Sequence, residues 1–196
     1  MRKVLLLFCI ICMLGLAGCQ KEEAQVETTK VISQGSNTKE GWWLKRNKEH
    51  QQPEFSQNVD LSKYDAYSVD TKAKNKKVMY LTFDCGYENG FTPKILDVLK
   101  KEKVPAAFFV TKPFIREDPE LVKRMKKEGH VVGNHTVHHK SMPTVSDRDN
   151  KQELIDCAEY CKKTTGYDMD MFMRPPMGEY SEHTLALTKK LGYKTI

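Results

Sequence analysis

The sequence has no internal repeat and no strong excess of charge of one sign. Charged residues make up 30% of its 196 residues, and the formal net charge is +6. Many lysines stand beside glutamates, as in residues 100–103, which favours a solvated helix face over a surface that binds nucleic acid. We therefore expect no nucleic-acid partner. The mildly basic balance would suit an anionic cell-wall polymer, although it does not select one.

Cysteine is scarce once the N-terminus is set aside. Six cysteines are present, but three of them lie within the first 19 residues. The others are Cys85, Cys157 and Cys161, and an odd number in an exported domain predicts that there is no disulfide scaffold. Cys157 and Cys161 are four residues apart in an expected helix. We interpret them as small core residues rather than as a bonded pair.

The N-terminus has the pattern of a targeting segment. Two basic residues precede an apolar stretch over residues 4–14, which is too short to span a membrane comfortably. Residues 16–19, Leu-Ala-Gly-Cys, are typical of a bacterial lipobox. We interpret residues 1–19 as a lipoprotein-type signal peptide with lipidation at Cys19, the alternative being a plain signal peptide that ends in cysteine. Either interpretation predicts export, with the protein held by the lipid on the outer face of the cell membrane or located in the cell wall.

Two segments of different character follow the signal peptide. Residues 20–40 are polar and poor in large apolar side chains, which predicts a disordered tether. Residues 41–76 have an irregular pattern with several aromatic side chains, and we expect an N-terminal extension that wraps the domain. Trp42 and Trp43 in this extension could line a sugar subsite, but packing is the favoured interpretation.

From residue 77 onward, strand-like apolar runs alternate with helical segments. Strands are expected at 78–83, 106–110, 131–132, 169–173 and 193–196, and helices from Thr92, from Asp118, over 147–163 and from Ser181. This alternation predicts an α/β fold with a parallel sheet and right-handed crossovers. Because the sequence ends inside the fifth strand, we expect residues 77–196 to be an incomplete domain, a barrel truncated before closure.

Polar motifs follow three of the expected strands, and they contain the residues Asp84, His135, His139 and Arg174. The carboxyl ends of parallel strands meet at one edge of a sheet, so these side chains should lie close together. Asp84 could act as a general base, although a lone turn of this kind is commonly structural. The two histidines could share a metal if the intervening turn is helical, and Arg174 could orient Asp84. Together they predict a metal-assisted hydrolase.

These motifs resemble those of the polysaccharide deacetylase family, the NodB-like domain of carbohydrate esterase family 4. The family pattern of Thr-Phe-Asp-Asp-Gly, His-Ser/Thr-x-x-His and Arg-x-Pro-x-Gly is matched from Thr82, His135 and Arg174. Residues 82–90 and 129–135 are also similar to the δ-lactam-forming N-acetylmuramic acid deacetylases of spore formers. The resemblance covers about residues 41–196.

The resemblance implies a distorted (β/α) barrel that removes N-acetyl groups from peptidoglycan, with N-acetylmuramic acid of the spore cortex as the favoured substrate. By position, Asp84 is the general base, and Arg174 holds it. His135 and His139 bind a divalent metal, usually zinc. The Met177 backbone N–H would stabilise the oxyanion, and the resemblance also implies Tyr87 as a contact of the substrate.

Two departures from the family pattern matter for activity. Cys85 replaces the family's second aspartate, so it is either a thiolate ligand of zinc or not a ligand at all. The family's downstream motifs, which include the general acid, would follow Ile196, and we therefore expect a fragment of an enzyme. A catalytically impaired glycan-binding module and a deacetylase of N-acetylglucosamine polymers stay open as alternatives.

Overall fold

The computed structural model describes residues 35–46, 48, 51–55, 59–73 and 77–196. The predicted signal peptide with Cys19 lies outside these ranges, as does most of the predicted tether. Within the described ranges, no helix combines the length and the apolar character that are needed to cross a membrane.

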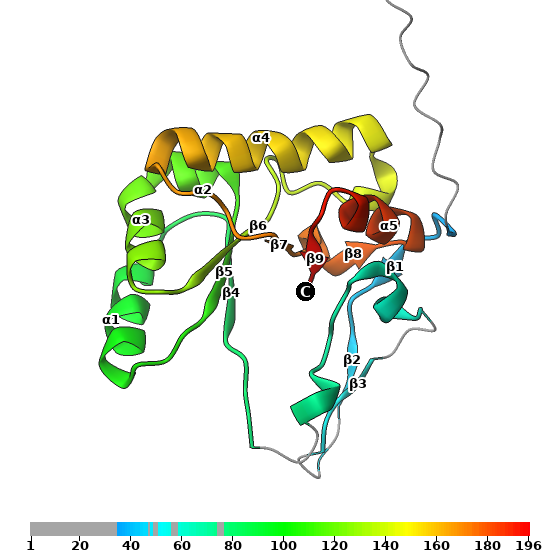
Figure 1. Ribbon diagram of the computed structural model, residues 1–196, viewed down its shortest axis with the longest axis horizontal. Coiled ribbons are helices and arrows are strands. Elements are labelled where there is room, and N and C mark those ends of the chain that lie inside the picture. The colour runs from blue at the N-terminus through cyan, green and yellow to red at the C-terminus, as the bar shows by residue number, and fades with distance from the viewer. Residues whose placement is uncertain (1–34, 47, 49–50, 56–58, 74–76) are drawn as a thin grey trace, which may run out of the picture. The chain divides into compact units, whose positions relative to one another are not determined.

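A parallel sheet forms the centre of the fold and confirms the predicted α/β class (Figure 1). In spatial order its strands are β4 (Thr82–Cys85), β5 (Ala107–Val110), β6 (Val131–Asn134), β7 (Phe172–Met173) and β9 (Lys194–Thr195). Every neighbouring pair in this sheet is parallel. Parallel strands need long crossover connections, and helices supply them here.

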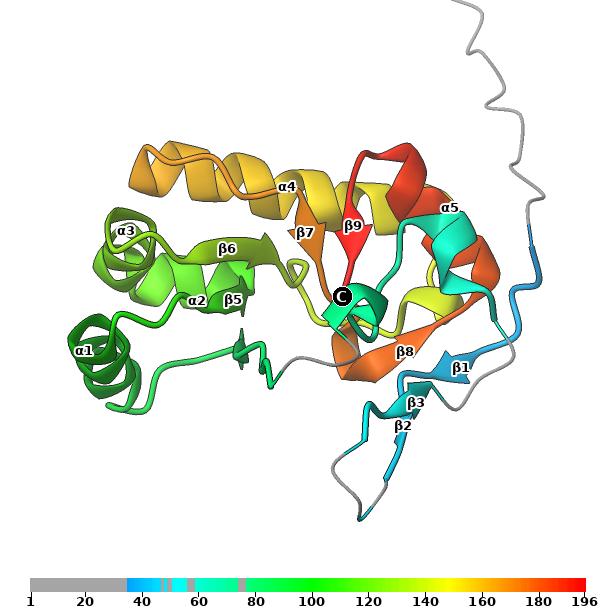
Figure 2. The same cartoon turned by 60° about the horizontal axis from the view of Figure 1, so that its bottom comes forward.

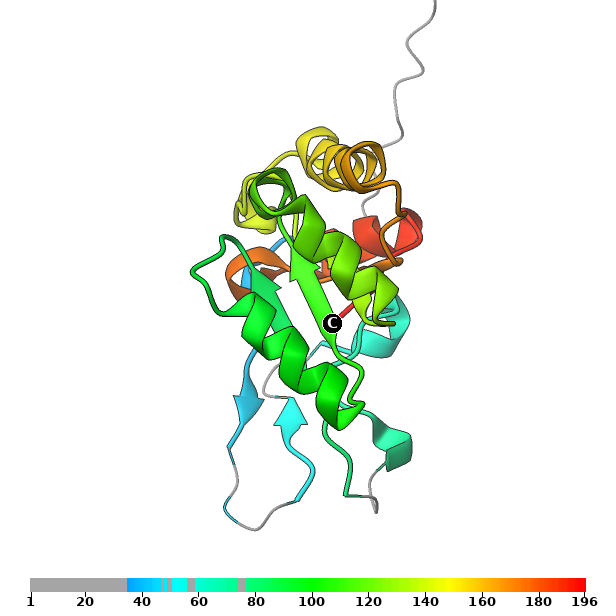
Figure 3. The same cartoon turned by 90° about the vertical axis from the view of Figure 1, so that its left-hand side faces the viewer.

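The crossover helices are α1 (Thr92–Glu102), α2 (Lys112–Glu117), α3 (Pro119–Lys127), α4 (Asp147–Thr165) and α5 (Glu182–Lys190). Figure 3 shows α1 and α3 side by side in front of the sheet, while α4 runs along another side of it in Figure 1. The main core between helices and sheet contains Phe108, Leu96 and Met125, all fully buried. Cys157 and Cys161 are free thiols buried in the same core, as predicted.

Some boundaries differ from those that the sequence predicts. The first strand of the sheet begins at Thr82 rather than at Val78, because its partner β5 begins only at Ala107, opposite Thr82. Residues 78–80 therefore have exposed side chains. The helix α1 does begin at Thr92, as predicted, and the carboxylate of Glu88 accepts the Thr92 N–H at 3.2 Å. The short helix α2 is not among the predicted elements.

The N-terminal extension contacts the sheet domain through its own short strands. β1 (Glu40–Gly41) pairs antiparallel with β8 (Glu179–Tyr180), and β2 (Leu44–Lys45) forms a hairpin with β3 (Glu54–Phe55) (Figure 2). The Trp42 ring packs edge-on against Tyr180, with 5.0 Å between ring centroids. This contact agrees with the packing interpretation of Trp42, whereas the neighbouring Trp43 is 69% exposed.

The outer edge of β9 is also covered by the N-terminal extension. Ala66 forms a parallel bridge with Thr195, in which the Tyr67 N–H donates to the Thr195 carbonyl at 2.8 Å. The Thr195 N–H in turn donates to the Asp65 carbonyl at 3.0 Å. The edge of β9 that faces away from β7 is therefore paired with the N-terminal extension. Pairing of its edge satisfies backbone groups that would otherwise need water.

Candidate active site

The sheet register places the candidate residues at one level. Cys85 is paired with Val110, Val110 with Asn134, and Asn134 with Met173. Asp84 therefore stands at the end of β4, while His135 and Arg174 directly follow β6 and β7. The expected meeting of these side chains at the carboxyl edge of the sheet is what the structure contains.

Arg174 pairs with Asp84, as its position after β7 predicts. Its Nη1 atom lies 3.0 Å from Asp84 Oδ1, with 22% of the arginine side chain and 44% of the aspartate side chain exposed. The guanidinium also lies over the ring of Phe109, with its Cζ atom 4.5 Å from the ring centroid. Since the ring and the carboxylate both attract the cation, Arg174 is held from two sides.

Gly133 makes room for the ring that supports Arg174. It lies opposite Phe109 in the pairing of β5 with β6. A Cβ atom on Gly133 would stand 2.7 Å from two carbons of the Phe109 ring and 2.9 Å from the carbonyl oxygen of Phe172. Only glycine fits such a close approach, so this residue lets Phe109 lie beneath the guanidinium.

His135 and His139 face each other across the same edge. Their Nε2 atoms are 3.1 Å apart. The Nδ1 atom of His135 lies 2.9 Å from the carbonyl oxygen of Arg174, which can only accept, so Nδ1 carries the proton and Nε2 presents its lone pair. Burial lowers the pKa of His135 in spite of nearby Asp84, which favours the neutral imidazole that metals bind.

The turn between the two histidines is not helical, although their spacing predicts a shared metal only for a helical turn. Thr136 and His139 both have left-handed backbone conformations, with φ of 69° and 54°. Such conformations cost on the order of 1–3 kcal/mol at non-glycine residues and persist where the surroundings impose them. Two local hydrogen bonds help, since Asn134 Oδ1 accepts the Thr136 N–H at 2.9 Å and Thr136 Oγ1 accepts the His139 N–H at 3.1 Å.

His138, between the two candidate ligands, contacts a carboxylate of α4. Its Nδ1 atom lies 2.6 Å from Oε1 of Glu153, a residue of α4 that sequence reasoning missed. The only sequence signal for Glu153 is its place beside Leu154 and four residues before Cys157, on the face of α4 that the core buries. A carboxylate on such a face needs partners, and the backbone of the histidine segment provides them.

Cys85 occupies the core side of β4. Its side chain belongs to the main core cluster with Leu96 and Val110, and burial raises the pKa of its thiol to about 12. In the part of the chain that the structure describes, no three His, Cys, Asp or Glu side chains form a group that could hold a metal ion. The two imidazoles can thus supply two nitrogen ligands to a cation. A zinc ion in a protein usually has about four ligands. A Cys85 that ligates zinc and a Cys85 that ligates nothing stay the two alternatives.

The two remaining predicted residues lie on exposed turns. Tyr87 follows β4, and Met177 stands in the turn η4 (Pro176–Gly178) with a left-handed φ of 59°. The next residue, Gly178, accepts the Trp42 N–H on its carbonyl oxygen at 2.7 Å. The N-terminal extension therefore holds the turn that carries the backbone of Met177.

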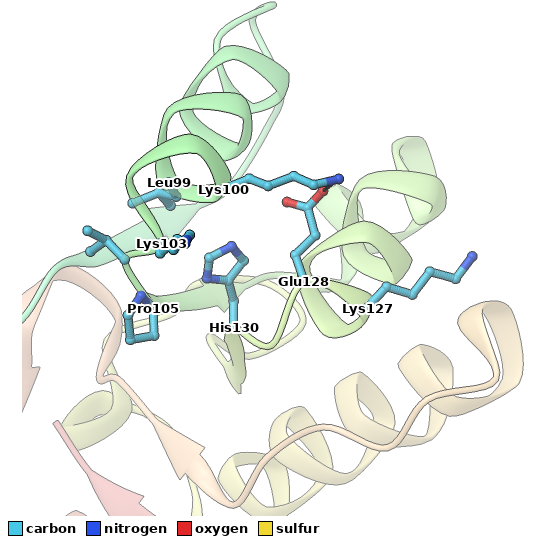
Figure 4. Close-up of a pocket in the computed structure, with 8 residues that line it drawn as sticks. Leu99, Lys100, Lys103, Pro105, Lys127, Glu128 and His130 are labelled. Atoms are coloured by element: carbon cyan, nitrogen blue, oxygen red, sulfur yellow. Dashed lines mark ion pairs between the residues drawn. The ribbon is translucent and has the colours of Figure 1, made fainter.

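A separate cavity of about 440 Å³ lies at the opposite edge of the sheet (Figure 4). It is lined by the ends of α1 and α3 and by His130, whose ring points into the hollow. His130 accepts the Ala106 N–H on Nδ1 at 3.2 Å, and burial lowers its pKa. Since His130 precedes β6 while His135 follows it, this cavity is not part of the candidate site.

Comparison with known proteins gives consistent relatives. Residues 71–196 match the family model for polysaccharide deacetylase. The peptidoglycan-N-acetylmuramic acid deacetylase PdaA of Bacillus subtilis is 45% identical over 158 residues, which cover 79% of this chain and 59% of that protein. A peptidoglycan-N-acetylglucosamine deacetylase of Bacillus cereus is 41% identical over 111 residues, covering 57% of this chain and 40% of that protein. The chain thus spans less than two thirds of the length of these curated relatives.

Among solved structures, that of Bacillus subtilis PdaA, described as a family 4 carbohydrate esterase, superimposes with a TM-score of 0.76. It is 44% identical to this chain, and the match covers 82% of this chain and 68% of the other. The similarity therefore extends from the sequence motifs to the arrangement of the sheet and its helices.

Proposed function

The chain belongs to the polysaccharide deacetylase family, and we propose that it hydrolyses the N-acetyl groups of peptidoglycan sugars, N-acetylmuramic acid in the first place. One observation carries this proposal. The Asp84–Arg174 pair and the facing imidazoles of His135 and His139 meet at the carboxyl edge of one sheet. Metal-assisted amide hydrolysis needs a carboxylate that can act as a general base next to side chains that can ligate a metal ion.

Asp84 is the general base in this proposal. Arg174 holds its Oδ1 atom, which orients the carboxylate so that Oδ2 can accept a proton from the attacking water. Nearly half of the Asp84 side chain is exposed, so water and substrate can reach it. The Phe109 ring packs beneath Arg174 and so limits movement of the guanidinium when a substrate binds.

His135 and His139 would hold a divalent cation, and zinc is the usual choice. Polysaccharide deacetylases are metal-dependent in general. When bound, such a cation polarises the acetyl carbonyl. The Arg174 carbonyl accepts from His135 Nδ1 and so aims His135 Nε2 at the shared position. The backbone N–H of Met177 would stabilise the oxyanion, and Tyr87 would contact the sugar.

A second candidate function is a glycan-binding module without catalysis. One observation favours it: among the described residues the histidine pair has no third partner that could complete a metal site, and Cys85 packs into the core. Such a module would keep the edge of the sheet as a sugar site. A substrate containing N-acetylglucosamine instead is supported by the Bacillus cereus relative.

The N-terminal pattern and the relatives support a proposal for the place of action. We infer export through residues 1–19, lipidation at Cys19 and action at the outer face of the membrane on the cell wall. A role in making muramic δ-lactam for the spore cortex belongs to the same proposal, because the supporting relative acts on N-acetylmuramic acid.

The test is acetate release from purified peptidoglycan, with zinc and after its removal by a chelator. We expect zinc-dependent release that falls by about 10²–10⁴-fold in Asp84→Asn, because the base is lost while its shape is kept. Asp168→Asn is the control, since Asp168 is a surface residue paired with Lys162. Glycan binding without release of acetate would favour the second candidate, and release from N-acetylglucosamine alone would correct the substrate.

A further inference from the structure

One buried carboxylate, that of Glu153, binds the middle of the segment that carries the histidine pair. Oε2 of Glu153 accepts the backbone N–H groups of Val137 at 3.0 Å and of His138 at 2.7 Å. Oε1 of Glu153 lies 2.6 Å from His138 Nδ1. Only 10% of the Glu153 side chain is exposed. Three short contacts thus converge on one carboxylate between the two candidate ligands.

These contacts act where the backbone is least favourable. Thr136 and His139, on either side of the two residues that Glu153 binds, have left-handed conformations. Such conformations persist only when neighbouring groups impose them. Hydrogen bonds to a carboxylate are stronger than those between neutral groups, so Glu153 is a strong constraint on this turn. The local bonds from the Thr136 N–H to Asn134 and from the His139 N–H to Thr136 hold the flanking residues rather than the two residues that Glu153 binds.

Glu153 itself stands on a helix that is fixed to the sheet. The Asn134 side-chain amide donates to the carbonyl oxygen of Leu154, the next residue of α4, at 2.8 Å. One turn further on, the Cys157 thiol lies 3.7 Å from the carbonyl oxygen of Val110. The carboxylate is therefore held in place relative to the ends of β5 and β6, which is what a residue that positions others requires.

We propose that Glu153 is a positioning residue whose carboxylate fixes residues 136–139 so that the Nε2 atoms of His135 and His139 face each other. The inference rests on the proposed function in one respect, namely that these two imidazoles hold a divalent cation. Glu153 does not touch that cation. It acts through the backbone of Val137 and His138, whose N–H groups both donate to Oε2, and through the His138 ring beside Oε1. A glutamine would lose the charge and the second acceptor oxygen.

The experiment measures the affinity of the purified chain for Zn²⁺ and the visible spectrum of its Co²⁺ form. Glu153→Gln keeps the size of the side chain but replaces one acceptor with a donor. We expect its affinity for Zn²⁺ to fall by about 10–100-fold, the usual effect of losing a partner outside the ligand shell, with a changed Co²⁺ spectrum. Glu153→Asp keeps the charge and should lose less. Glu159→Gln, the same change at an exposed position of α4, should bind as the parent does.

Each outcome decides the proposal. Affinity and spectrum that are unchanged in Glu153→Gln would overturn it, as would a parent chain that binds no Zn²⁺. A lower melting temperature with unchanged metal binding would also overturn it and leave Glu153 a stabilising residue only. If Glu153→Gln does not fold, His138→Ala removes one of the three contacts, and the same measurement on that variant decides. Acetate release reports on the proposed function separately, because the affinity can fall in Glu153→Gln whether or not the parent releases acetate.

Discussion

The histidine loop, residues 135–140, and the arginine loop, residues 174–178, form the candidate site together but are held by different means. The histidine loop is held by a buried carboxylate on α4, through hydrogen bonds to its backbone. The arginine loop is held by the N-terminal extension, through the β1–β8 pairing and the bond from the Trp42 N–H to Gly178. One support is a directional charge-assisted contact, and the other combines strand pairing with aromatic packing.

The two supports also come from different parts of the chain. Glu153 lies within residues 71–196, which match the family model, whereas Trp42 and β1 precede them. The metal side of the site, formed by the histidine loop, is therefore built inside the family domain. The base side, formed by Asp84 and the arginine loop, also depends on residues outside that domain. It follows that mutations should be able to damage one side while leaving the other intact.

Removing the Arg174 side chain should give the largest loss of activity in this comparison, because it disrupts the base side of the site. In Arg174→Ala, Asp84 loses its partner at 3.0 Å, and we expect acetate release to fall by about 100-fold, the effect of misplacing a reacting group. Zn²⁺ affinity should change little, because His135 contacts only the backbone carbonyl of Arg174. Steady-state kinetics and metal titration measure the two effects. Arg148→Ala on the surface is the control, and a parallel loss of Zn²⁺ affinity would argue against separable sides.

Removing the Asn134 side chain should lower the free energy of unfolding, because this side chain supports the histidine loop. This fully buried side chain donates to the Leu154 carbonyl and to the Tyr193 hydroxyl, and it accepts the Thr136 N–H. Asn134→Ala leaves these groups buried without their partner, so we expect a loss of about 2 kcal/mol in the free energy of unfolding. Urea denaturation measures it, with Gln152→Ala on the exposed face of α4 as the control. A change below the error of the control would show that water replaces the amide.

Truncating Trp42 should loosen the arginine loop and leave the histidine loop alone. The ring packs against Phe55 and Tyr180, with centroids 5.4 and 5.0 Å away, next to the turn that carries Met177. For Trp42→Ala we expect acetate release to fall by about 10-fold, less than for direct loss of Arg174, with Zn²⁺ affinity preserved. Trp43→Ala provides the comparison. A loss in Trp43→Ala that equals or exceeds that in Trp42→Ala would instead favour a sugar subsite at this pair.

The smallest expected effect is on the pH dependence of stability. It concerns Cys157 of α4, where burial raises the pKa of the thiol. Its pKa in the unfolded chain is about 8.5. A raised pKa in the folded state means that this contribution to stability is complete below about pH 8.5 and is lost as the pH rises above it. We expect the free energy of unfolding to fall between about pH 8 and about pH 10, by at most about 1.4 kcal/mol per pH unit for this thiol. Urea denaturation of Cys157→Ala should give a shallower fall. An equal slope would assign the pH dependence to other groups.

Sequence reasoning recovered the parts of the fold and site that repeat a local rule. Alternating apolar runs predicted the parallel sheet, and residues placed just after strands predicted that Asp84, His135 and Arg174 would meet. It failed where contacts join distant segments. The pairing of Ala66 with Thr195 has no local signal, and neither does the helix α2 between two predicted elements.

The sequence by itself determined the alternation of the sheet strands with helices, the residue types at the strand ends and the family, because each depends on periodicity or on motifs within a few residues. Only the tertiary structure decided that Cys85 faces the core, that the turn between the histidines is left-handed and that Glu153 fastens it. Those features depend on which side of a strand or helix meets its neighbour. The free energy of such contacts comes from packing and burial between segments far apart in the chain, and no local pattern encodes it.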